Sequence, residues 1–83
     1  MSNNFDQVEK LLDQYRSELD QAYLDCSETG QFYAGQFNNH LVMIWKSAKE
    51  DGMIEFEFQE IVEEVVSEYI DQIFYPFPMT MAA

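Results

Sequence analysis

Three stretches of this chain repeat apolar residues every three or four positions, which is the spacing of one face of an α-helix. Glycine-containing breaks at residues 26–30 and at Gly52 separate them, and Pro76 and Pro78 follow the last stretch. The pattern favours helices, because a half-buried strand alternates with a period of two. We predict an all-α fold in one domain over residues 1–83: a small antiparallel three-helix bundle with helices at about 4–26, 33–51 and 56–75.

Two segments leave an alternative open. Residues 53–58 alternate apolar and polar side chains, so a short extended segment at 53–57 is the alternative to a helix that begins there. The second segment is the aromatic, proline-containing tail from Phe74 to Met81. It either folds back over the core or presents an exposed apolar patch.

Charge is unevenly distributed along the chain. The chain has sixteen acidic and four basic residues, for a net charge of −12. Residues 1–28 hold seven acids and two bases, residues 29–52 hold two of each, and residues 53–83 hold seven acids and no base. Such a surface repels nucleic acid and anionic membranes and attracts basic proteins. We therefore expect a protein partner, with no direct binding to nucleic acid or membrane.

We expect the acids to form a stripe on each of the two anionic helices. A helical projection places five acids of the third helix within a sector of about 80°, with Glu63 beside it: Glu57, Glu60, Glu64, Glu68 and Asp71. The expected stripe of the first helix consists of Asp6, Glu9, Asp13, Glu18 and Asp25. We expect Asp20 to pair with Arg16, one turn away. Mutual repulsion should turn both stripes outward, with the neutral second helix packed against both.

The stripes suggest a function. Carboxylates at i and i+4 stand about 6 Å apart, comparable to successive phosphates of a nucleic acid, and they destabilise an isolated helix. The third segment carries such pairs without a compensating lysine. A merely solvated face is the simpler alternative. The sequence favours an inhibitor that mimics nucleic acid and occupies the DNA- or RNA-binding site of a nucleic-acid-binding protein or other basic protein.

In charge and size the chain is similar to small acidic anti-defence proteins of phages and mobile elements that block DNA-binding proteins. This likeness is one of composition, and no motif identifies a family. The second hypothesis is a helical adaptor, or an immunity or antitoxin-like protein, for one specific basic partner. An apolar anchor, such as Trp45 or the region of Phe77, should then dominate its affinity.

Other functions find little support in the sequence. No nucleophile motif, glycine-rich phosphate loop or metal-ligand spacing occurs, so we expect no enzyme activity, cofactor or metal site. We expect Cys26 to be buried and His40 to be partly buried for structural reasons. No signal peptide or membrane span is apparent, which makes a cytoplasmic location the default expectation.

The chain has more apolar residues than one small bundle can cover. The surplus favours a twofold homodimer, which would add the buried area that a domain of this size lacks. The residues concerned are Val42, Met43, Phe74, Tyr75, Phe77, Met79 and Met81.

Overall fold

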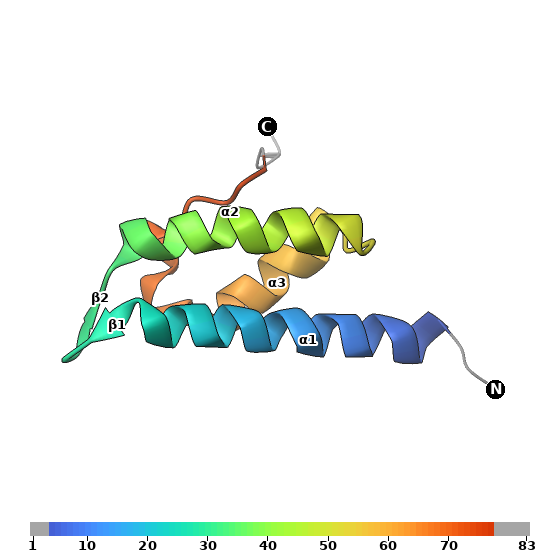
Figure 1. Cartoon of the computed structure of the whole chain (residues 1–83), viewed down its shortest axis with the longest axis horizontal. Coiled ribbons are helices and arrows are strands. Elements are labelled where there is room, and N and C mark those ends of the chain that lie inside the picture. Colours follow the sequence, from blue (N-terminus) through green and yellow to red (C-terminus); the bar gives the residue numbers. More distant parts are fainter. Residues whose placement is uncertain (1–3, 78–83) are drawn as a thin grey trace.

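The computed structural model describes residues 4–77, and Figure 1 shows how their elements are arranged. Helices α1 and α2 run antiparallel, and α3 crosses between them. The predicted all-α bundle of three main helices is therefore confirmed. In chain order, the elements are α1 (Asn4–Asp25), β1 (Ser27–Glu28), β2 (Gln31–Phe32), α2 (Ala34–Glu50), α3 (Glu55–Val65) and the 3-10 helix η1 (Ser67–Gln72).

A small hairpin joins α1 to α2. Strands β1 and β2 pair antiparallel, with Ser27 opposite Phe32. The turn between them contains Thr29 and Gly30, with φ of 48° and 78°, and glycine adopts this left-handed conformation without the steric cost of a Cβ. The strands themselves were not predicted, because two residues are too few to show a strand pattern.

The third helix is shorter than predicted. Ile54 is extended, with φ of −92° and ψ of 162°, and α3 begins at Glu55, so only the approach to the helix is non-helical. The prediction that this helix continues to residue 75 is wrong, because α3 ends at Val65 and a 3-10 helix follows. This 3-10 helix places Tyr69 against the hairpin, where its ring stacks on that of Phe32 with the ring centroids 4.6 Å apart. The aromatic contact favours the change of direction over a longer helix.

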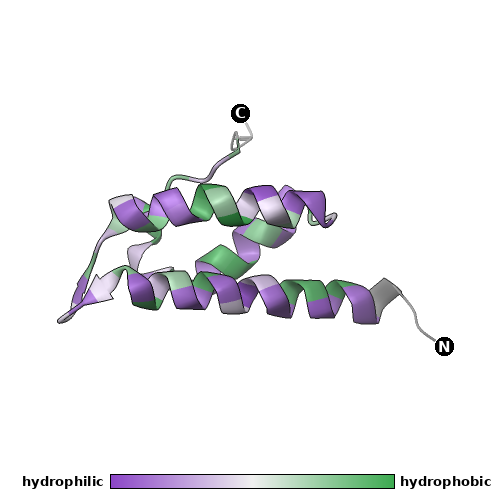
Figure 2. Ribbon diagram, in the orientation of Figure 1, coloured by the Kyte–Doolittle hydropathy of each residue, from purple (hydrophilic) through white to green (hydrophobic). Residues whose placement is uncertain are grey.

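One hydrophobic core lies between the helices. The apolar residues of each helix recur in bands, as Figure 2 shows by hydropathy. Cys26 is buried, as predicted, and burial raises the pKa of its thiol. The buried apolar residues are Tyr15, Leu19, Ala22, Cys26, Phe37, Leu41, Trp45, Ala48, Met53, Phe58, Ile61, Val62, Val66, Ile73 and Phe77.

The first part of the aromatic tail folds back along α2. The backbone N–H of Phe74 donates to Asn38 Oδ1 at 3.0 Å, and the ring of Phe77 lies 5.1 Å from that of Trp45. Phe77 is buried, whereas the Phe74 side chain remains exposed. The fold-back alternative is thus observed up to Phe77, and Met79 and Met81 lie outside the described residues.

No helix among residues 4–77 is long and apolar enough to cross a bilayer.

Candidate protein-binding surface

The acids of α1 do not form the predicted single stripe. Helix α1 is uninterrupted, and successive residues turn by about 100°. Asp6, Glu9, Asp13 and Asp20 therefore share a sector of about 60°. Glu18 lies five residues after Asp13, about 140° around the helix, and Asp25 lies on the same side as Glu18. The prediction that Glu18 and Asp25 belong with the other acids is wrong.

The stripe of the third segment is also interrupted. Glu57, Glu60 and Glu64 lie on one side of α3, as predicted, with Glu63 beside them. Glu68 and Asp71 lie on η1, whose backbone follows a different turn, so they do not extend the stripe. Apart from Glu57, which is half-buried, every predicted site residue is exposed.

Arg16 connects the acids of α1 with those of α3. Its Nε donates to Glu64 Oε1 at 2.8 Å, and its Nη1 donates to Asp13 Oδ1 at 2.7 Å. The expected partner, Asp20, lies one turn away on the same side of α1, but the ion pairs of Arg16 are with Asp13 and Glu64. The hydrogen bond to Glu64 raises the pKa of Arg16 above its ordinary value. One cation therefore holds carboxylates from both anionic helices together.

This arrangement differs from the expectation that both acidic stripes turn outward, because Arg16 joins acids of α1 and α3 where the two helices meet. Helix α2 contacts both of the others, as expected, but α1 also packs directly against α3. Glu9, Asp13 and Arg16 line a shallow depression of about 270 Å³ on α1. Three glutamates of α3 line a second one of about 320 Å³. We name the combined surface the α1–α3 acidic face; it consists of Glu9, Asp13, Arg16, Glu60, Glu63 and Glu64.

Two glutamates of α3 also stabilise the local structure. Glu57 Oε1 accepts the backbone N–H of Ile54 at 3.1 Å, which caps the start of α3. Glu63 Oε2 accepts from Gln59 Nε2 at 3.0 Å and from the Tyr75 hydroxyl at 3.5 Å. Burial, together with the nearby charge of Glu63, raises the pKa of Tyr75 to about 12. These contacts restrict the orientation of both carboxylates.

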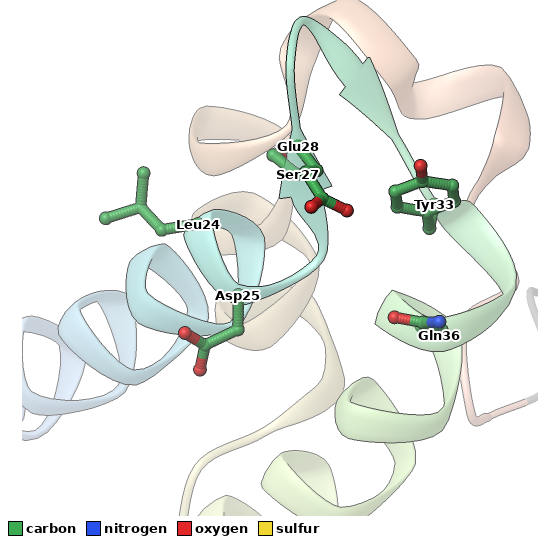
Figure 3. Close-up of a pocket in the computed structure, with 6 residues that line it drawn as sticks. All are labelled: Leu24, Asp25, Ser27, Glu28, Tyr33 and Gln36. Carbon is green, nitrogen blue, oxygen red and sulfur yellow. The ribbon is translucent and has the colours of Figure 1, made fainter.

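A separate open pocket of about 670 Å³ lies where α1, the hairpin and α2 meet. Figure 3 shows the Glu28 carboxylate directed toward the ring of Tyr33, whereas the side chains of Leu24 and Asp25 extend away from them. Asp25 accepts a hydrogen bond from Gln21 at 3.1 Å.

Three other predicted candidates lie elsewhere. His40 is exposed, so its predicted partial burial is wrong; it lies at the solvent edge of α2. Trp45 and Phe77 pack in the core beside Phe58, so neither can anchor a partner from the surface. Among residues 4–77 no group of three or more histidine, cysteine, aspartate or glutamate side chains is placed to hold a metal ion.

Two features of this surface were not predicted from the sequence. The first is the Arg16–Glu64 bond, which joins residues 48 positions apart and has no local signal. The second is Phe56, which is 63% exposed beside the acidic face. Its signal was present: Phe56 and Phe58 lie about 200° apart on a helix, so only one of them can face the core.

Comparison of the chain with known protein families, with curated proteins and with solved structures found no match.

Proposed function

We propose that this chain is a non-catalytic, acidic inhibitor that binds a basic protein through the α1–α3 acidic face and occupies its nucleic-acid-binding site. The observation that carries the proposal is the bridge made by Arg16, which gathers carboxylates of Asp13 and Glu64 from two helices into one anionic surface. A nucleic-acid-binding protein that neutralises phosphates with lysine and arginine would meet similarly spaced anions here.

The distribution of charge supports this assignment. Lys46 and Lys49 are exposed on α2, and the ion pairs that reach the acidic face within residues 4–77 are those of Arg16. Like charges brought close together on a folded surface cost free energy. A basic partner would recover that cost on binding, because it would supply the missing counter-charges.

The proposal also includes a cellular location and a biological role. The chain would act in the cytoplasm, in the manner of anti-defence proteins of phages and mobile elements, whose small size and acidic composition it shares. A second candidate is an adaptor or immunity-type protein for one specific basic partner. Exposed apolar side chains next to the acids, such as Phe56, favour that candidate.

The test begins with capture of partners from a cell lysate at low salt, followed by mass spectrometry. Each captured protein is then purified and its affinity is measured at increasing salt, with duplex DNA or RNA as competitor. Mimicry predicts that affinity falls steeply with salt and that nucleic acid competes. Recovery of proteins that have no nucleic-acid function, with no competition, would contradict mimicry and favour the adaptor.

Matched variants identify the surface that binds. Glu9→Gln/Glu60→Gln removes two charges from the acidic face without removing either partner of Arg16. Glu18→Gln/Asp25→Asn removes the same charge from the other side of α1. We expect the first pair to weaken binding about tenfold and the second to weaken it about twofold or less. Equal losses would show that net charge, rather than this face, governs binding.

A further inference from the structure

Phe56 is an apolar side chain that the fold does not use. It lies two residues before Phe58, and the two are about 200° apart on α3. Phe58 is fully buried in the core, whereas Phe56 is 63% exposed. The helix therefore directs Phe56 away from the core, although an exposed aromatic ring is unfavourable in water.

The neighbours of Phe56 on α3 are acidic. Glu60 follows it by four residues and Glu63 by seven, so both lie on the same side of the helix. These two glutamates help to line the shallow depression on α3. An exposed phenyl ring thus stands at the border of the α1–α3 acidic face.

The charges around Phe56 identify what can cover it. A second copy of this chain, docked through the same face, would bring Glu60 and Glu63 of both copies together, and the acids would repel each other. A membrane surface is excluded for the same reason, because cellular membranes carry negative charge. A basic protein surface can pair its cations with the carboxylates and can also bury the ring.

We propose that Phe56 is the apolar anchor of the acidic face and inserts into an apolar pocket bordered by arginine or lysine side chains on the partner protein. The proposal rests on the part of the proposed function that both candidates share, the binding of a basic protein by the acidic face, and adds the chemistry of the partner's site. Hot spots of protein interfaces are buried aromatic anchors surrounded by polar contacts, and this arrangement matches that pattern. Arginine also stacks favourably on an aromatic ring, which would reinforce the fit at the border.

Phe74 supplies a matched control. It is 75% exposed, but its backbone N–H binds Asn38 of α2, so it stands beside a different helix. Phe56→Ala and Phe74→Ala therefore remove the same side chain from two surfaces. Both variants should retain the wild-type circular dichroism and Trp45 fluorescence, because neither ring belongs to the core.

The probes are two synthetic helical peptides of equal length and charge. One carries arginine on one face and leucine on the other, and the second has serine in place of leucine. The full chain should bind the leucine peptide about tenfold tighter than the serine peptide, and the preference should persist at high salt, where charge attraction is screened. Phe56→Ala should abolish this preference, and Phe74→Ala should leave it intact.

Each outcome decides one part of the argument. The proposal that Phe56 is the anchor is overturned by any of three results. The wild-type chain shows no preference for the leucine peptide, the preference survives Phe56→Ala, or Phe74→Ala removes it equally. The Glu9→Gln/Glu60→Gln variant tests the underlying acidic face separately, because it should weaken binding of both peptides at low salt. If it binds both as tightly as wild type, the proposed binding face fails, whatever the result for Phe56.

Discussion

Arg16→Gln should destabilise the fold more than its surface position alone suggests. The substitution keeps a polar side chain, although a shorter and uncharged one, and removes both charged hydrogen bonds, to Asp13 at 2.7 Å and to Glu64 at 2.8 Å. It also leaves these carboxylates near each other without the cation between them. Lys10→Gln is the matched control, because Lys10 is an exposed base on the same helix.

The size of the effect follows from exposure. The side chains of Arg16, Asp13 and Glu64 are 39%, 75% and 60% exposed, so solvent screens each pair. Exposed ion pairs contribute about 0.2–1 kcal/mol each. Two screened pairs, together with the repulsion that they offset, give a loss of about 1 kcal/mol in the free energy of unfolding. For a domain of this size that corresponds to a melting temperature lower by roughly 4–8 °C.

Urea denaturation followed by circular dichroism, at low salt and at about 1 M salt, measures this loss. The difference between Arg16→Gln and wild type should shrink at high salt, because screening weakens both the lost attraction and the exposed repulsion. Lys10→Gln should change stability by about 0.5 kcal/mol or less. The electrostatic reasoning is refuted if the two variants lose equal stability, or if the loss from Arg16→Gln does not depend on salt.

Two further predictions concern other parts of the molecule. The buried Tyr15 hydroxyl donates to Asp51 Oδ2 at 2.5 Å, and burial, followed by the bond and charge of Asp51, raises the pKa of Tyr15 to about 12. The contribution of this hydrogen bond to stability should be complete below about pH 10 and should disappear as the pH rises to about 12. Tyr15→Phe should lower the free energy of unfolding by about 1–2 kcal/mol at neutral pH. Urea denaturation at several pH values measures both effects. We also predict a homodimer through the exposed Val42 and Met43 on α2. The dimer should associate more strongly at high salt, and Met43→Glu should disrupt it. A single monomeric mass by sedimentation equilibrium at both low and high salt would rule the dimer out.

Local sequence patterns were sufficient to predict the helices but not where the third one ends. The recurrence of Leu19, Leu41 and Ile61 with their neighbours specifies buried helical faces, and all three are buried. The end of α3 at Val65 has no such signal, because the apolar period continues through Ile70. Stacking of Tyr69 on Phe32, 37 residues earlier, accompanies the change to a 3-10 helix, and no local pattern contains that contact.

The candidate surface was predicted only in part, for the same reason. Charge along the chain identified the acidic helices, and the side of α3 that carries Glu60 and Glu64 follows from the helical period. How α1 is rotated against α3 depends on packing, and that rotation brings Arg16 to Glu64 rather than to Asp20. The packing that joins the acids also decides which aromatic residue is left outside. Once Phe58 fills the core, Phe56 must stand among the acids, so the anchor and the acidic face arise from one helix orientation.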